Sequence, residues 1–203
     1  MLVATIFFSC VVVAIAADSR YETAEQYVDQ AKIIATVRMI ERQPVEFEYR
    51  RKPSSCGNRY TAEIMEVFKG ESGSEIEFYG PGEEHFIGLN EEYLVLIFER
   101  DIDEAKTILA PVIESQTGFD KARYLCTLEA ATKFVRADPQ TMIPFDRDAA
   151  AQLGGRWLRH RSITAVPLES FQQETVSLGN RSVIVTKWPE VEDWINETIS
   201  KSP

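Results

Sequence analysis

The hydrophobic pattern begins with an almost unbroken apolar run at residues 2–16, which ends in Ala14-Ile15-Ala16. This run is too short to span a bilayer, and its small-x-small end is typical of a signal-peptidase site. We therefore predict a signal peptide over 1–16, cleaved after Ala16, and a secreted or periplasmic protein. No later stretch of the sequence contains the roughly twenty apolar residues that a membrane span needs.

The pattern after this leader predicts one short helix and then several strands. Thr23 and Gln26 have the spacing of a capping box, and apolar residues follow at helical spacing to about Gln30. Alternating positions then predict strands at 33–40, 45–49, 60–68, 76–79 and 91–98, with further strands at 107–113 and 122–128 and a turn at Gly118. The run at 91–98 is apolar on both faces, which indicates a central strand. Pro53-Ser54-Ser55 is expected to break the strand that begins at Val45.

The character of the sequence changes after about Phe134. Pro139 and Pro144 interrupt this segment, a Gly154-Gly155 turn follows them, and strand candidates lie at 162–166 and 182–187. The segment from Pro189 has acidic residues in its first turn and one apolar face, so we predict an amphipathic C-terminal helix. We expect this helix to pack on the rest of the chain, and a partner-binding helix is the alternative. Many strands without an alternating strand–helix pattern favour a small, mainly β barrel or sandwich.

The charge of the chain narrows the classes of partner. Its 32 acidic and 22 basic residues give a net charge of −10, and the predicted leader contains no ionisable side chain. Nucleic acids and anionic membrane surfaces both attract basic patches, so neither is expected as the main partner.

Two cysteines, Cys56 and Cys126, remain after the predicted cleavage. In an oxidising compartment they are expected to form one disulfide, which would close a loop of about 70 residues and stabilise the fold by roughly 4 kcal/mol. Two inert thiols are the first alternative. The second is a reactive thiol paired with His85 or His160.

Several segments between residues 23 and 128 resemble a known family. They are Ala-Glu-Gln-Tyr-Val-Asp-Gln-Ala-Lys-Ile-Ile-Ala-Thr-Val at 24–37, Tyr-Thr-Ala-Glu-Ile-Met-Glu-Val-Phe-Lys-Gly at 60–70, the Gly-Pro-Gly turn at 80–82, and Gly-Leu-Asn-Glu-Glu-Tyr-Leu-Val-Leu at 88–96. Their order resembles that of secreted oligosaccharide/oligonucleotide-binding (OB) barrels of the netrin-module type, which include the tissue inhibitors of metalloproteinases and bacterial relatives. The resemblance implies a five-stranded OB-like barrel over 17–134, preceded by a helix. An α+β extension over 135–203 would follow it.

The sequence also departs from that family. The animal inhibitors act through a cysteine at the mature N-terminus that chelates the target's zinc, whereas the predicted mature chain begins Ala17-Asp18-Ser19. The family tends to place a cysteine just after the Gly-Pro-Gly turn, where this chain has His85. Metalloprotease inhibition by the family mechanism is therefore not expected.

Two basic segments are the candidate binding sites. Arg50, Arg51 and Lys52 form either a solvated turn or a protruding hairpin tip that touches a partner. The second segment contains Arg156, Trp157, Arg159, His160 and Arg161. It could hold an anionic or carbohydrate ligand by forked hydrogen bonds and stacking, or it could form local salt bridges around a core Trp157.

The sequence contains little that is typical of an enzyme or a metal site. It has no Gly-x-Ser-x-Gly motif, no phosphate-binding glycine loop and no zinc-ligand spacing, so we predict no catalytic residues, no metal and no cofactor. Glu83, Glu84 and His85 are interpreted as an acidic loop, with a weak calcium site as the alternative. Asn180 and Asn196 begin glycosylation sequons, which have meaning only in a eukaryotic secretory pathway.

These patterns together predict a non-enzymatic binding module that acts on another extracytoplasmic protein. The first alternative is a small-ligand or carbohydrate-binding barrel, favoured if Tyr60, Phe78 and Tyr93 form a concave aromatic face. The second is a hydrolase whose paired carboxylates converge in one cleft.

Overall fold

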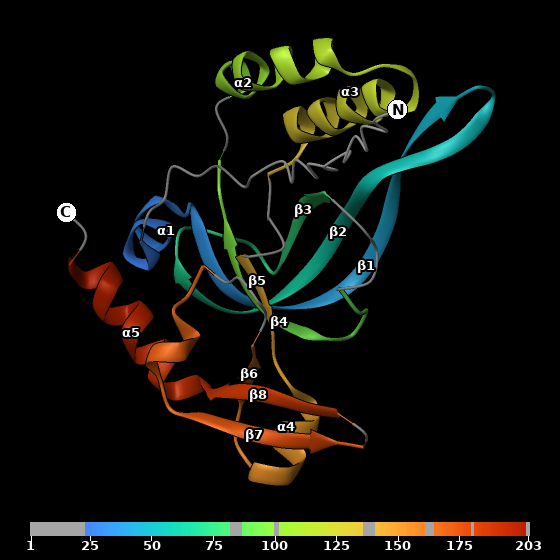
Figure 1. Cartoon of the computed structure of the whole chain (residues 1–203). Helices are drawn as coiled ribbons and strands as arrows, with labels where there is room; N and C mark the ends of the chain where they lie inside the picture. The colour runs from blue at the N-terminus through green and yellow to red at the C-terminus, as the bar shows by residue number, and fades with distance from the viewer. Residues whose placement is uncertain are drawn as a thin grey trace, which may run out of the picture.

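The computed structural model describes residues 23–81, 87–99, 102–135, 141–160, 165–179 and 181–201. The predicted signal peptide therefore lies outside the described residues. The elements are α1 (Ala24–Gln30), β1 (Ile33–Tyr49), β2 (Lys52–Lys69), β3 (Glu75–Pro81), β4 (Glu92–Ile97), α2 (Ile102–Ser115), α3 (Gly118–Lys133), β5 (Met142–Pro144), α4 (Arg147–Leu153), β6 (Trp157–Arg159), the short 3-10 helix η3 (Leu168–Ser170), β7 (Gln173–Leu178), β8 (Arg181–Lys187) and α5 (Trp188–Lys201). The fold is mainly β with an N-terminal helix, as predicted, and its strands form two antiparallel sheets (Figure 1). No helix among the described residues is long and apolar enough to cross a membrane.

The capping box predicted at the start of α1 is present. The side chain of Thr23 accepts a hydrogen bond from the Gln26 N–H, and the Gln26 side chain accepts one from the Thr23 N–H. At the other end of the helix, Lys69 Nζ donates to the Val28 carbonyl at 3.0 Å. Both ends of this short helix therefore have partners for backbone groups that the helix itself leaves unpaired.

The larger sheet has the strand order β3-β2-β1-β4-β5, and β1 pairs antiparallel with both β2 and β4. Strands β3 and β5 form its two edges, and no ladder joins them in the described part of the chain. The nearest link is the Tyr79 N–H, which donates to the Val135 carbonyl at 2.9 Å. The sheet is open between these edges, so the closed barrel is not confirmed.

Strands β1 and β2 form a long hairpin whose end extends past the rest of the sheet (Figure 1). The prediction that Pro53 breaks a strand is wrong, because β2 begins at Lys52 and Pro53 pairs with Glu48. Proline is tolerated here because β3 pairs with β2 only from Gly57 onward, which leaves the start of β2 on a free edge.

The strands predicted at 107–113 and 122–128 are also wrong, because both segments are helical, in α2 and α3. In α2 the buried side chains Leu109 and Ile113 are four residues apart, which is helical rather than strand spacing. In α3 the buried positions are Cys126, Thr127 and Ala130, and good helix formers surround them. The apolar positions of both segments fit a period of 3.6 as well as a period of two, so the pattern alone does not distinguish the helix from the strand.

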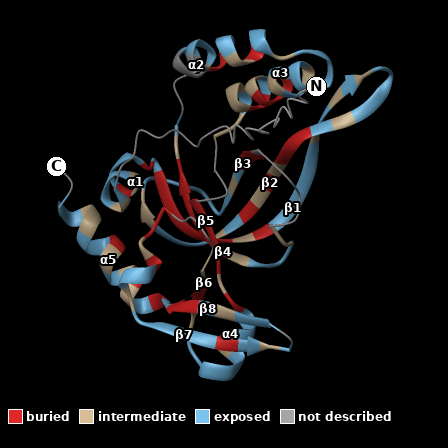
Figure 2. Ribbon diagram, viewed as in Figure 1, coloured by how far each residue is buried: buried red, intermediate tan, exposed pale blue. Residues whose placement is uncertain are grey.

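The larger sheet is buried on both faces at its centre, in β4 and the first half of β1, as expected for β4 (Figure 2). One face packs around Val37, Tyr60 and Phe78. The opposite face, with Ile34, Leu94 and Leu96, packs against the C-terminal part of the chain.

The smaller sheet has the order β6-β8-β7, and β8 confirms the strand predicted at 182–187. The predicted C-terminal helix is α5, whose Val191 and Ile195 are fully buried against the larger sheet. This helix packs within the chain, as the first of the two interpretations expected. The candidate at 162–166 lies mostly outside the described residues, and its described end, Ala165 and Val166, is not in a strand.

Candidate functional site

The tip of the β1–β2 hairpin is a two-residue turn made of Arg50 and Arg51. Tyr49 pairs with Lys52, and the two arginines between them have φ angles of 52° and 61°. Two-residue hairpin turns of type I′ require such left-handed values at both positions, and Asn-Gly is the favoured pair. A side chain bearing a Cβ costs roughly 1–2 kcal/mol in this conformation. The chain thus has two arginines at positions where residues such as Asn and Gly would make the fold more stable.

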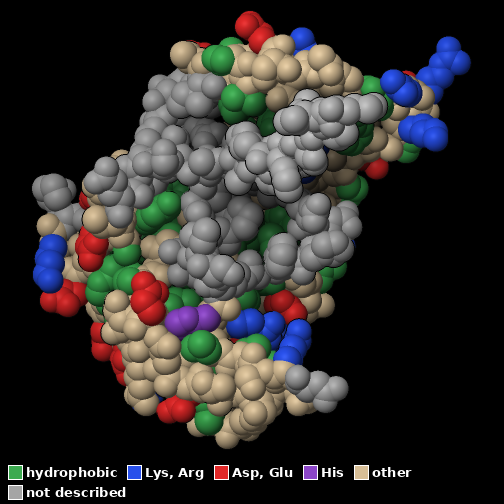
Figure 3. Space-filling model, in the orientation of Figure 1, with side chains coloured by type: hydrophobic (Ala, Val, Ile, Leu, Met, Phe, Trp, Pro, Cys, Tyr) green, Lys and Arg blue, Asp and Glu red, His purple; other side chains and the backbone are tan. Residues whose placement is uncertain are grey.

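The three cations of the tip are exposed (Figure 3). Within the described residues, Arg51 and Lys52 make no ion pair, and Arg50 lies 5.3 Å from the centroid of the Tyr49 ring. The predicted turn is confirmed, and it stands at the end of the protruding hairpin.

Aromatic side chains attach the tip to α3. Phe119 has ring-centroid distances of 5.6 Å to Phe47 and 5.4 Å to Tyr49, and it remains 40% exposed. Gly118 begins α3 with a φ of +59°, and a Cβ at that position would lie 3.1 Å from the Tyr49 hydroxyl oxygen. Glycine therefore allows the close approach of helix and hairpin.

The disulfide between Cys56 and Cys126 is present and joins β2 to α3. The pairing shifts from Val45–Gly57 to Glu46–Ser55, so Cys56 is the additional residue of a β-bulge. A bulge changes the direction of a side chain relative to a regular strand, and here it is the position that reaches the helix. The two half-cystines are 3% and 8% exposed. Because the sulfurs are bonded to each other, a reactive thiol paired with His85 or His160 does not occur in this state.

A groove with a volume of about 520 Å³ lies between β1 and α3. Residues 43–48 of the strand form one side, and the helix contributes Ala122, Leu125, Glu129 and Lys133 to the other. Lys133 Nζ lies 2.6 Å from Glu129 Oε1, and this hydrogen bond lowers the pKa of the Glu129 carboxyl. Sequence reasoning missed the groove because it placed a strand where α3 lies.

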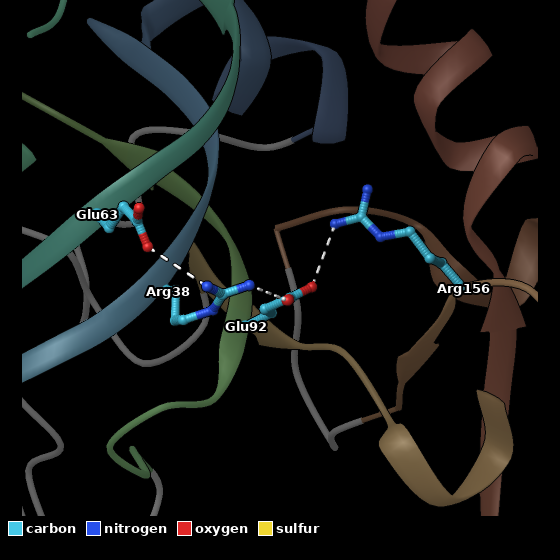
Figure 4. A network of polar contacts seen from close by, with 4 residues as sticks. All are labelled: Arg38, Glu63, Glu92 and Arg156. Atoms are coloured by element: carbon cyan, nitrogen blue, oxygen red, sulfur yellow. Dashed lines mark hydrogen bonds and ion pairs between the residues drawn. The ribbon is translucent and has the colours of Figure 1, made fainter. Parts of the chain in front are cut away.

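The second basic segment forms salt bridges within the chain. Arg156 Nη2 lies 3.6 Å from Glu92 Oε2, and the guanidinium carbon of Arg156 is 4.1 Å from the centroid of the Phe145 ring. Glu92 also accepts a hydrogen bond from Arg38 at 3.0 Å, and Arg38 bridges onward to Glu63, so the four side chains form one network (Figure 4). Arg156 is thus engaged with the larger sheet.

The other described residues of this segment are also held by the fold. Trp157 is 6% exposed, and its Nε1 donates to the Gly154 carbonyl at 2.6 Å. Arg159 Nε donates to the buried carboxylate of Asp146 at 2.7 Å. This is the arrangement of local salt bridges around a core tryptophan. Arg161 lies outside the described residues.

Near this network, Glu192 on α5 occupies a partly buried, acidic position. Burial is the main cause that raises the pKa of its carboxyl; Glu66 and Asp193 raise it further, while Arg156 and a hydrogen bond from Trp188 oppose the rise.

His160, which follows β6, is in contact with the smaller sheet. Its Nε2 lies within hydrogen-bond distance of the Thr186 hydroxyl, which in turn donates to the Leu168 carbonyl. Burial lowers the pKa of this imidazole, and the nearby Glu169 opposes the shift. The folded state therefore binds the proton less readily than the unfolded state.

We expect this histidine to make the protein less stable in acid. Because the folded pKa is depressed, the unfolded state takes up the extra proton first, and stability falls as the pH decreases below about 6.5. Unfolding by urea at pH 7.5, 6.5 and 5.5 measures this slope, which His160→Gln should reduce. Glu77→Gln, at an exposed position of β3, is the control and should keep the slope. An unchanged slope in His160→Gln would contradict the assignment.

Metal binding gains no support from the described residues, which contain no group of three or more His, Cys, Asp or Glu side chains placed to hold an ion. Glu83, Glu84 and His85 lie outside the described residues, as does Asn180, whereas Asn196 is exposed on α5.

Comparison with known proteins leaves the family open. No family model matches the chain, and no curated protein matches it.

Proposed function

We propose that this chain is a non-enzymatic binding module that recognises another extracytoplasmic protein through the tip of its β1–β2 hairpin. The observation that carries the proposal is the left-handed backbone conformation of Arg50 and Arg51 at that tip. Strained backbone that persists in a fold is often found where it serves binding. With Lys52, the tip presents three exposed cations on a chain of net charge −10. Such a local reversal of charge favours an acidic partner surface and steers its approach.

The proposed compartment is secreted or periplasmic. The Cys56–Cys126 disulfide supports it, because disulfides persist in oxidising compartments. An anionic membrane is a weaker choice of partner, since three cations fall short of the clusters of four to eight that typically bind acidic lipids.

An OB-like barrel of the netrin-module type remains our proposal for the five-stranded sheet. It is supported by the number of strands and by the Tyr79–Val135 hydrogen bond, which brings the chain before β5 towards the β3 edge. OB folds are partly open five-stranded barrels, so an open edge is compatible with that class.

The two alternative functions have less support. Tyr60, Phe78 and Tyr93 are at most 2% exposed, so they form core rather than the concave aromatic face that a carbohydrate-binding barrel would use. A carboxylate-based hydrolase needs a general acid with a raised pKa, whereas the pKa of Glu129 in the groove is lowered. The pKa of Glu192 is raised, but this residue lies on α5 and does not line the groove.

The strain at the tip leads to a stability prediction. The double substitution Arg50→Asn with Arg51→Gly supplies the pair that a type I′ turn favours, and it should raise the free energy of unfolding by about 1–2 kcal/mol. Chemical denaturation measures the change. Glu77→Gln, at an exposed position of β3, should have no comparable effect. A double variant that is no more stable than the wild type would contradict the claim that the backbone of Arg50 and Arg51 is strained.

The same double variant tests recognition. We expect a cross-linked pull-down from the native extracytoplasmic fraction to recover one protein near stoichiometry with the wild type, and at least tenfold less with the more stable variant. Equal recovery by both proteins would exclude the hairpin tip as the contact.

A further inference from the structure

The groove between β1 and α3 starts beside the hairpin tip and runs away from it. Phe47 lines the groove and also contacts Phe119 near the start of α3. At the far end, Arg59 lies 5.8 Å from the centroid of the Phe134 ring, just after the end of the helix. The strand and the helix therefore run side by side along the groove. Six strand residues correspond to a length of roughly 20 Å.

The shape of the groove suits an extended chain. Its strand side consists of six consecutive residues, 43–48, so it includes backbone as well as side chains, because alternate side chains of a strand point to opposite faces. Strand β4 pairs with β1 only at Ile33–Arg38. Beyond Met39, that edge of β1 has no strand partner among the described residues. A segment added along this edge would lie next to β1 and in line with β4.

The backbone of this edge of β1 is poorly suited to regular hydrogen bonding with a long added strand. Pro44 has no N–H, and the register shifts between Val45 and Glu46. Proline and bulges are two of the devices by which edge strands resist unspecific pairing. A bound segment must therefore be short and recognised mainly by its side chains.

The charges of the groove show which side chains would fit. Its two cations are engaged: Arg59 donates to the Gln43 side chain, and Lys133 pairs with Glu129. The carboxylates of Glu46 and Glu48 make no ion pair or hydrogen bond with any described residue. Leu125 adds an apolar contact and is 48% exposed. The lining carries three carboxylates (Glu46, Glu48 and Glu129) and two cations, so the net charge of the groove is negative, whereas the tip beyond Glu48 is positive.

From this pattern we infer that the groove binds a short extended segment of the partner, with basic and apolar side chains beside Glu46, Glu48 and Leu125 and an acidic residue at the hairpin tip. The acidic contact rests on the proposed function. The basic and apolar contacts are independent of it. Charge complementarity of this kind fixes the register and direction of a bound chain.

The test uses two synthetic, fluorescein-labelled peptides with the mature disulfide-bonded protein. One peptide alternates Lys and Val over eight residues and ends in Asp-Asp, and the other replaces Lys by Glu and Asp by Lys. Fluorescence anisotropy should show at least tenfold tighter binding of the first peptide. Equal binding of the two peptides would overturn the inference.

Variants locate the binding. Glu46→Gln with Glu48→Gln should weaken the first peptide at least fivefold, and Ala122→Trp should block the groove and abolish binding. Glu75→Gln with Glu77→Gln, at two exposed positions of β3, is the matched control for charge and should leave the affinity unchanged. If this control pair weakens binding as much as the groove pair does, the peptide is attracted by the net charge alone and the inference fails.

Two further outcomes separate this inference from the proposed function. If Arg50→Asn with Arg51→Gly weakens the first peptide while the groove variants do not, the tip binds and the groove does not, which overturns the inference only. Sedimentation analysis reports self-association: a dimer that Ala122→Trp dissociates would assign the groove to a second copy of the chain and would also overturn it.

Discussion

Replacing both disulfide cysteines, as Cys56→Ser with Cys126→Ser, is expected to lower the free energy of unfolding by about 4 kcal/mol. The disulfide closes a loop with a sequence separation of 70 residues, and its loss returns that conformational freedom to the unfolded chain. The bond also links α3 to the hairpin, where the remaining contacts near the tip are the partly exposed rings of Phe47, Tyr49 and Phe119.

Urea denaturation of the double variant measures this loss. The wild type after reduction serves as the control, because it loses the bond without gaining serine hydroxyls, and the two losses should agree. Titration of the unfolded, unreduced wild type should find no free thiol at these positions. A loss below about 1 kcal/mol would contradict a stabilising disulfide.

The second large effect is expected at Asp146, where Asp146→Ala should cost about 3 kcal/mol. Its carboxylate is fully buried, accepts the Ala149 N–H at the start of α4, and pairs with Arg159. Losing a helix cap costs about 1 kcal/mol, and leaving a partly buried guanidinium without its partner adds the rest.

Chemical denaturation again measures the change, with Asp148→Ala as the matched control. Asp148 lies in the first turn of the same helix but is exposed, so its removal should cost less than about 1 kcal/mol. Equal losses for the two substitutions would mean that the Asp146–Arg159 pair contributes nothing to the fold. Arg159 could then again be considered a binding residue rather than a structural one.

Local signals in the sequence predicted the local features of the fold. The Thr23–Gln26 spacing predicted the capping box, and alternation predicted β1 and the central strands, because these elements are determined by neighbouring residues. The segments of α2 and α3 were assigned to strands because short apolar runs fit both periods. The helix period is recognised only once Leu109 and Ile113 are seen to face the same side.

In the candidate site, too, features that depend on neighbouring residues could be predicted, and features that depend on distant residues could not. The turn at Arg50 and Arg51 could be predicted from the charged break between two alternating segments. The positive φ angles and the contact with Phe119 could not, because they depend on where a helix some seventy residues later crosses the hairpin. Similarly, the composition of residues 156–161 was compatible with a ligand site. Only the partners Glu92 and Asp146, distant in sequence, show that Arg156 and Arg159 are engaged within the fold.

The most direct test of the proposed recognition is site-specific photo-cross-linking from the hairpin tip. A photoreactive residue is placed at Lys52 in the full chain, or at Glu77 on β3 as the control position, and the protein is exposed in its native extracytoplasmic fraction. We predict one abundant protein adduct from position 52, absent from position 77 and strongly reduced when Arg50→Asn and Arg51→Gly are also present. No adduct from position 52, or the same adducts from both positions, would contradict a binding module that works through this tip.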